Sequence, residues 1–246
     1  MKKTIRLAMF LSILTLSLSC TGNSNFEVSE NFDQQSSQEI ADAREKIQQD
    51  FSDAKSILKL TPKEKLAILN QYQHLDPKKE VPQDLLIEAI LYFDLNKSKF
   101  ENHNYFSVIN YKARSDRPRF FVIDLASGVV EKFNTAHGWG SDKDDDGYAT
   151  SFGNVINSKK SSLGFAKTAE VYYGRFDRSI RIDGLSASNS NVRERAVVIH
   201  GSDKVHERPE VQGLSQGCPA LDWDVKDGII DKIQSGSLIN MGYSLQ

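Results

Sequence analysis

Two residues near the C-terminal end of the sequence, His200 and Cys218, could together carry out nucleophilic chemistry. His200 ends the apolar run Ala196–His200, and Cys218 follows in the segment Ser215–Pro219. A cysteine is the stronger nucleophile as a thiolate, and an adjacent histidine can take the thiol proton or pair with the thiolate. Such a pair would keep the sulfur partly ionised near neutral pH. The alternative is a buried Cys and a buried His on neighbouring strands.

Three small residues complete this predicted site. Gly201 directly follows His200 and lets backbone or substrate approach closely. Gly217 permits a tight turn, at which its own amide and that of Cys218 could face an oxyanion. Ser215 opens the same segment, so we place it with Gly217 in the site loop.

The N-terminal residues have the pattern of a secretion signal. Lys2, Lys3 and Arg6 precede an apolar run over residues 7–18, which is too short to span a membrane. The run ends in a small residue followed by Cys20, which resembles a bacterial lipobox with Ser17 in place of the usual leucine. We predict a signal peptide over residues 1–19 and a lipid anchor on Cys20; an ordinary cleaved signal is the alternative.

The cysteine count makes Cys218 more informative. The sequence has two cysteines, so lipidation of Cys20 would leave Cys218 as a lone thiol in a compartment where thiols usually pair. Thr21 follows Cys20 where an aspartate would favour the inner membrane. We therefore predict a location in the cell envelope, in the periplasm, as an outer-membrane lipoprotein whose membrane contact is that anchor.

Composition describes an ordinary globular chain. Its 246 residues are 39% hydrophobic and 26% charged, with a net charge of −2. These values exclude a disordered chain and a disulfide-stapled mini-protein. They provide no basic surplus for binding nucleic acid through bulk charge, so we predict no nucleic-acid partner.

The chain changes character along its length. Residues 20–37 are polar and read as a flexible tether. Residues 38–100 have helical periodicity, with Thr61 and Glu64 forming a capping box around Pro62. We expect this helical segment to pack against the next domain or to space it from the membrane.

From residue 105 to 246 the sequence is rich in β-branched and aromatic runs separated by turn residues. The predicted strands are Phe106–Tyr111, Arg119–Asp124, Val129–Asn134, Ala169–Tyr173, Ser179–Ile182, Ala196–His200 and Ser237–Tyr243, and one helix is predicted over Asp224–Gln234. The expected fold class is α+β, with a β-rich sandwich or barrel preceded by a small helical segment.

These motifs resemble the L,D-transpeptidase catalytic domain, the YkuD-like murein enzymes, in the branch with Gly-Cys-Pro-Ala at the nucleophile. The likeness begins with His200-Gly201 and Ser215-Gln216-Gly217-Cys218. It extends to Phe121–Leu125, Ala136–Gly138, Phe152–Asn154, Ser158–Gly164, Ile182–Leu185 and Gly217–Ala220, and so covers about residues 105–243. Ala220 stands where more familiar members carry Arg or Asn, and Arg193 or Arg195 could replace that residue in binding a substrate carboxylate.

The resemblance implies a mechanism and a partner, the stem peptides of peptidoglycan. Cys218, activated by His200, would attack the diaminopimelate–D-Ala bond of a tetrapeptide stem and form a thioester. The amine of a second stem would resolve it to a 3-3 cross-link; water would give an L,D-carboxypeptidase, and a protein amine would attach a protein to the wall. A backbone carbonyl commonly orients the histidine in this family, and Ser202, Asp203 and Ser215 are also near enough to be considered. A catalytically silent peptidoglycan-binding protein is the alternative outside enzyme chemistry.

Other candidates are weaker. His137, in Ala-His-Gly, could line the cleft or be structural. The run 142–147 matches the first half of a calcium loop, but Gly153 occupies the position of the bidentate glutamate, so we favour a solvated acidic turn. Trp139 and Trp223 flank the site loops and could pack or stack on substrate. We predict no metal and no cofactor.

Overall fold

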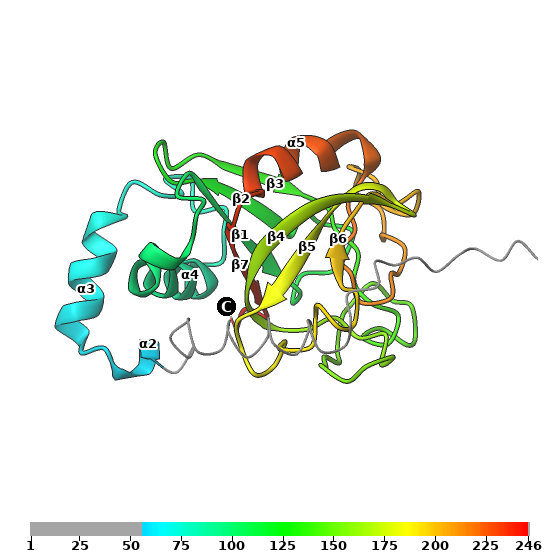
Figure 1. Cartoon of the computed structure of the whole chain (residues 1–246), viewed down its shortest axis with the longest axis horizontal. Coiled ribbons are helices and arrows are strands. Elements are labelled where there is room, and N and C mark those ends of the chain that lie inside the picture. Colours follow the sequence, from blue (N-terminus) through cyan, green and yellow to red (C-terminus); the bar gives the residue numbers. More distant parts are fainter. Residues whose placement is uncertain (1–55, 246) are drawn as a thin grey trace, which may run out of the picture. The chain divides into compact units, whose positions relative to one another are not determined.

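A curled seven-stranded sheet forms the centre of the computed structural model, which describes residues 56–245 (Figure 1). The strand order is β3-β2-β1-β7-β4-β5-β6. The strands are β1 Tyr105–Asn110, β2 Phe120–Asp124, β3 Val130–Phe133, β4 Gly164–Gly174, β5 Asp177–Gly184, β6 Val198–Ile199 and β7 Leu238–Gly242. The helices are α2 Ser56–Lys59, α3 Pro62–Gln71, α4 Gln83–Leu95 and α5 Trp223–Ile233, with a 3-10 turn at Lys97–Lys99.

Helices cover both faces of this sheet. Alternate residues along the strands point to opposite faces. Phe106 and Val108 therefore join the core under α4, whereas Ile109 joins the core under α5. Figure 1 shows α4 and α5 on opposite sides of the strands. The predicted α+β class, a β-rich domain with a helical segment before it, is confirmed.

The described part of the predicted helical segment packs against the sheet. Thr61 accepts a hydrogen bond from the Glu64 amide at 3.3 Å and the Glu64 carboxylate accepts one from the Thr61 amide at 2.7 Å, so the predicted capping box is present. The carbonyl of Leu85 in α4 accepts a hydrogen bond from the side-chain amide of Asn240 in β7 at 3.0 Å. The predicted signal peptide, the predicted tether, Cys20 and residues 38–55 of the predicted helical segment lie outside the described residues.

Strand β6 differs from its prediction. The apolar run Ala196–His200 forms only two strand residues, because Ala196 has a left-handed φ of 50° and His200 leaves the sheet to pair elsewhere. Two residue pairs, Ile180 with Ile199 and Arg181 with Val198, attach β6 to β5. This short strand carries the chain from the sheet directly to His200.

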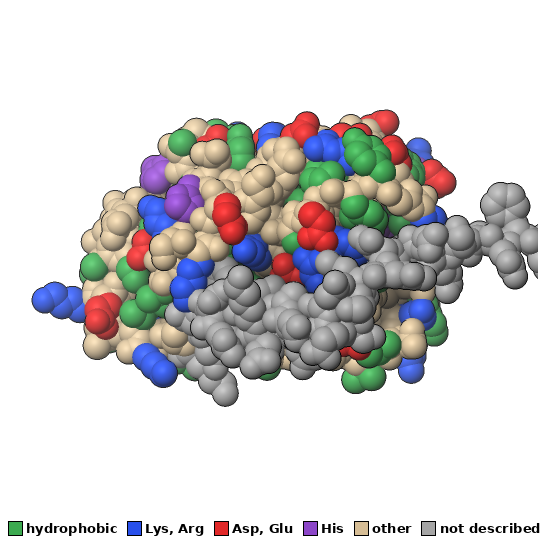
Figure 2. All heavy atoms as spheres, in the orientation of Figure 1, with side chains coloured by type: hydrophobic (Ala, Val, Ile, Leu, Met, Phe, Trp, Pro, Cys, Tyr) green, Lys and Arg blue, Asp and Glu red, His purple; other side chains and the backbone are tan. Residues whose placement is uncertain are grey.

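Surface features add two general points. None of the helices within residues 56–245 is long and apolar enough to cross a membrane. On the face shown in Figure 2, acidic and basic side chains of the described residues are interspersed, as the nearly balanced composition suggests.

Candidate active site

Backbone hydrogen bonds bring the His200 and Cys218 segments side by side. The amide of Leu221 donates to the His200 carbonyl at 2.9 Å, and the amide of Ser202 donates to the Leu221 carbonyl at 2.9 Å. On the other side of the cysteine segment, the amide of Ser215 donates to the His137 carbonyl at 2.8 Å. The segment Ser215–Pro219 is thus held between two chain segments that are distant in sequence.

The His200 ring is oriented by a backbone carbonyl. Its Nδ1 lies 2.7 Å from the carbonyl oxygen of Gly201, and a carbonyl can only accept, so Nδ1 carries the proton and Nε2 of the neutral ring is a proton acceptor. Among the side chains considered from the sequence, Asp203 instead accepts from the Trp223 indole and Ser215 donates to the Cys218 carbonyl. Burial lowers the pKa of His200, so the resting imidazole is neutral near pH 7.

Cys218 is partly exposed, and its thiol faces the chain that enters β6. Its Sγ lies 3.8 Å from the carbonyl oxygen of Ala196. Burial raises the pKa of the Cys218 thiol, while the Val198 amide and the positive charge of Arg195 oppose that shift. The expected partly ionised thiol is therefore wrong for the resting site, in which the Cys218 thiol and the His200 imidazole are both neutral near pH 7. A neutral thiol needs a base to take its proton during attack, and a neutral imidazole can act as such a base.

Of the two amides predicted to face an oxyanion, those of Gly217 and Cys218, the first is already in use. The Gly217 amide already donates to the Ser215 hydroxyl at 3.0 Å, and that hydroxyl donates to the Cys218 carbonyl at 2.7 Å. Within residues 56–245, the Cys218 amide has no hydrogen-bond partner, so it is the donor that remains for an oxyanion. Gly217 has a φ of +117°, and a Cβ there would lie 2.7 Å from the Lys160 carbonyl, so the loop requires glycine.

The two candidate arginines have separate positions. Arg195 approaches the segment Ser215–Pro219, since its Nη2 would lie 3.3 Å from a Cβ on Gly217 and its charge acts on Cys218. Its guanidinium donates to the Gly153 carbonyl, the Ser162 hydroxyl and the Lys160 carbonyl. It therefore supplies fixed positive charge beside the sulfur.

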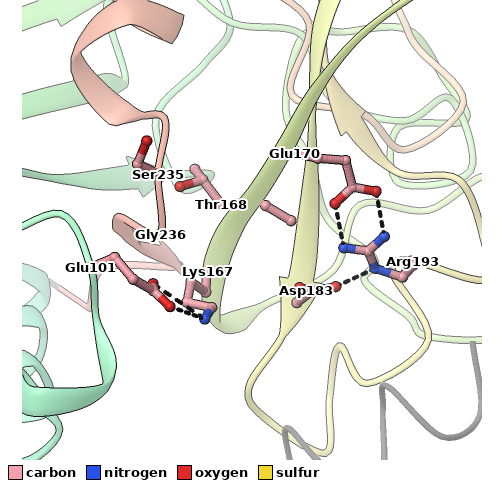
Figure 3. Close-up of a pocket in the computed structure, with 9 residues that line it drawn as sticks. Glu101, Lys167, Thr168, Glu170, Asp183, Arg193, Ser235 and Gly236 are labelled. Carbon is pink, nitrogen blue, oxygen red and sulfur yellow. Dashed lines mark hydrogen bonds and ion pairs between the residues drawn. The ribbon is translucent and has the colours of Figure 1, made fainter.

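Arg193 belongs to an ion cluster on β4 and β5. Its guanidinium bonds both carboxylate oxygens of Glu170, at 2.8 and 3.0 Å, and also the carboxylate of Asp183 (Figure 3). These residues line a hollow that includes Lys167 and Glu101 but none of the predicted catalytic residues. The Arg193 guanidinium is thus engaged by Glu170 and Asp183, two residues ahead of Arg195 in the chain.

The family model of the L,D-transpeptidase catalytic domain matches residues 77–241, more than half of the chain. This chain belongs to that family. No curated protein matches the sequence. The match begins within the helical segment, ahead of α4, so the L,D-transpeptidase domain includes a helix that the sheet needs for its core.

Solved structures with some likeness include three bacterial proteins. An L,D-transpeptidase from Mycobacterium tuberculosis is 12% identical over 56% of this chain and 57% of its own, with a TM-score of 0.38. The helical cell shape determining protein Pgp2 from Campylobacter jejuni is 12% identical over 60% and 50%, with a TM-score of 0.38. An L,D-transpeptidase (Yku) from Stackebrandtia nassauensis is 9% identical over 73% and 78%, with a TM-score of 0.35. This chain spans about half the length of the first two.

His137 of this L,D-transpeptidase domain is buried and does not line a cleft. Its side chain is 0% exposed and lies between Arg119 and Asp142. Arg119 Nη2 donates to His137 Nδ1 at 2.7 Å, so the ring's proton is on Nε2, which donates to Asp142 at 3.0 Å. Burial and the neighbouring Arg119 charge lower the pKa of His137 to about 4. The prediction that His137 could line the cleft is wrong, because Arg119 and Asp142 engage both nitrogens of the buried ring.

We predict that His137 makes folding stability dependent on pH. An unfolded His binds a proton below about pH 6.5, whereas His137 in the fold binds one only below about pH 4. The unfolded chain therefore holds more protons in this window, and the free energy of unfolding should fall by up to about 3 kcal/mol from pH 6.5 to pH 4. Urea unfolding at several pH values measures this. The His137→Gln variant, which cannot titrate, should be less stable at pH 7 and should show a smaller slope; an unchanged slope would assign the effect elsewhere.

The acidic run brings three carboxylates together. Ligand oxygens of Asp142, Asp144 and Asp146 lie within 4.8 Å of one another. Asp142 is already occupied by the His137 ring and by the amides of Gly147 and Asp146. The other two carboxylates are exposed, and exposed acidic groups commonly gather without a metal.

We predict that calcium leaves the domain unchanged. A calcium loop needs six to eight oxygen ligands including a bidentate carboxylate, and Gly153 provides no side chain at that position. Thermal unfolding with micromolar calcium or with a chelator should give the same Tm. A calcium-dependent rise in Tm that Asp144→Asn removes would contradict the prediction.

Two tryptophans and one phenylalanine flank the site. Trp139 is 50% exposed, and its amide donates to the Ser215 carbonyl at 3.0 Å. Trp223 packs so closely on Gly201 that a Cβ there would lie 2.3 Å from its ring, which explains the glycine after His200. Phe176 stacks on the His200 ring, a contact that the sequence does not predict because the residue lies in a hairpin turn with no motif of its own.

Proposed function

We propose that this chain is a peptidoglycan L,D-transpeptidase that uses Cys218 as nucleophile and His200 as general base. The observation that carries the proposal is the Nδ1–Gly201 hydrogen bond, which leaves Nε2 of His200 unprotonated beside the loop of a partly exposed cysteine. The substrate is the tetrapeptide stem, and the bond cleaved is the one between diaminopimelate and D-Ala.

The first half-reaction forms a thioester. As Cys218 Sγ bonds to the carbonyl carbon, its proton passes to His200 Nε2, and the Cys218 amide and the Arg195 charge stabilise the oxyanion. The carbon–nitrogen bond then breaks, and the proton on Nε2 passes to the leaving amine of D-Ala. Because the thiol and the imidazole both start neutral, no charge is separated before substrate is bound.

The second half-reaction repeats the proton transfers in reverse. The amine of another stem attacks the thioester and gives a proton to His200, and the carbon–sulfur bond breaks as that proton returns to Cys218. The product is a 3-3 cross-link. Water in place of the amine would give a carboxypeptidase, and a protein amine would attach a protein to the wall.

Two features bear on the alternatives. Ala220 is buried, and its carbonyl accepts from Ala136 and Thr135, so this position is occupied by structural contacts and binds no carboxylate. Arg195 is committed to backbone and hydroxyl acceptors, which suits it to charge stabilisation better than to grasping a substrate. The intact Cys218, His200 and Arg195 set favours an enzyme over a silent wall-binding protein.

We propose that the enzyme acts in the periplasm, held at the outer membrane through lipid on Cys20. This location follows from the secretion-signal pattern of residues 1–19 and from the need of the proposed chemistry for peptidoglycan.

Product analysis tests the proposal. The purified protein is incubated with disaccharide-tetrapeptide, and the products are separated and weighed by mass spectrometry. The expected products are free D-Ala and 3-3 linked dimers. Tripeptides without dimers would replace transfer by hydrolysis, and unchanged substrate would favour the wall-binding alternative.

A further inference from the structure

The turn between β4 and β5 places an aromatic ring on the candidate general base. Arg175 and Phe176 connect the two strands, and the Phe176 ring lies 4.0 Å from the His200 ring, centroid to centroid, at an interplanar angle of 20°. The two rings are therefore stacked face to face. His200 is 5% exposed, and Phe176 is itself half-buried.

The hairpin tip is anchored, so this contact does not depend on a free loop. Arg178 Nη2 bonds the Asp231 carboxylate of α5 at 2.6 Å. The buried Lys226, also in α5, donates to the Arg178 carbonyl at 3.2 Å and to Asp227 at 2.8 Å. Because α5 begins at Trp223, which packs on Gly201, one helix holds both the hairpin and the backbone next to His200.

We propose that Phe176 is a positioning residue of this enzyme, which keeps the His200 ring in the plane that maintains the Nδ1–Gly201 hydrogen bond and keeps water from the ring face. The inference rests on the proposed role of His200 as the proton acceptor for Cys218. A single hydrogen bond leaves an imidazole free to rock about it, and a stacked ring removes that freedom. The same ring maintains the burial that disfavours the charged imidazolium.

Removal of the Phe176 ring would reduce the burial of the His200 ring that it stacks on. Burial and the Gly201 carbonyl are the causes that act on its pKa. The charged side chains on the hairpin, on α5 and on the loop after His200 have partners of their own. Asp203 accepts from the Trp223 indole, and Arg178 pairs with Asp231. Lys226 pairs with Asp227 and lies 3.9 Å from Asp177, and Arg175 lies over the Phe176 ring. In the segment Ser215–Pro219, Cys218 is a neutral thiol, and the positive charge of Arg195 acts on that thiol.

The test compares Phe176→Ala and Phe176→Leu with Phe176→Tyr, which retains the ring. Tyr173→Ala is the matched control, because Tyr173 is in the same hairpin and is 75% exposed. In the alanine and leucine variants we expect kcat to fall by about tenfold, with KM little changed, since a stacked aromatic pair contributes on that scale. The acid limb of the kcat profile should move to higher pH in the alanine variant, because an exposed imidazole holds its proton more strongly. The tyrosine variant should restore both values.

An NMR titration of His200 in the intact protein separates this inference from the proposed function. Phe176→Ala should raise the His200 pKa toward its ordinary value, whether or not the protein turns over substrate. An unchanged His200 pKa and unchanged kcat in a folded Phe176→Ala protein, with Cys218→Ala inactive, would overturn the role of Phe176 and leave the proposed function standing. A raised pKa in a protein that has no activity toward stems would support the positioning of His200 and overturn the proposed function.

Discussion

Replacing Cys218 with alanine should reduce turnover of tetrapeptide stems to background. Removal of the nucleophile in a catalytic unit of this kind costs on the order of 10⁴–10⁶-fold in kcat. No other cysteine lies within the described residues to take its place. Release of D-Ala from disaccharide-tetrapeptide, followed over hours, is the measurement.

The Cys218→Ser variant makes the test more specific. Serine keeps the shape and the partial exposure of the side chain, but its hydroxyl has a much higher pKa than a thiol and is a far weaker nucleophile. We expect it to bind stems with little change and to turn them over barely faster than Cys218→Ala. Turnover at the wild-type rate by either variant, in a protein with unchanged Tm, would contradict the assignment of Cys218.

Replacing His200 with alanine should lower kcat by roughly 10²–10⁴-fold, the usual contribution of a positioned general base. The loss should be larger than the loss from removing the histidine of an enzyme whose cysteine has a lowered pKa. Burial raises the pKa of Cys218, so its thiol needs a base to take the proton. Activity measured across pH provides the readout.

The wild-type profile should rise with pH through a value below 6.5, since burial lowers the pKa of His200 and only the neutral ring accepts a proton. His200→Ala should lack this acid limb and should gain activity only at alkaline pH, where the thiol ionises without help. A variant that keeps the wild-type acid limb would show that another group titrates there.

Local sequence patterns predicted the elements well. Runs of β-branched and aromatic residues marked the strands, and Thr61 with Glu64 marked the start of α3 through contacts three residues apart. Residue type and the adjacent glycines also singled out Cys218 and His200 as a candidate pair, and the structure brings their segments side by side. In each case the information lies within a few residues of chain.

What the sequence could not predict depends on contacts between distant segments. Phe176 meets His200 only because β5 pairs with β6 and carries the hairpin turn alongside the end of that strand. The burial of His137 depends on Arg119, from before β2, and the raised pKa of Cys218 depends on how completely the surrounding chain covers its sulfur. The spacing of residues along the sequence does not reveal these contacts.

The measurement that tests the central claim most directly is the mass of the acyl-enzyme. The protein is mixed with excess disaccharide-tetrapeptide and quenched in acid within the first turnover, and peptide mapping then locates any adduct. We predict that Cys218 carries the stem minus its terminal D-Ala as a thioester, that neutral hydroxylamine removes this adduct, and that His200→Ala accumulates it more slowly. An adduct on another residue, or release of D-Ala with Cys218 remaining unmodified at every time point, would contradict the account.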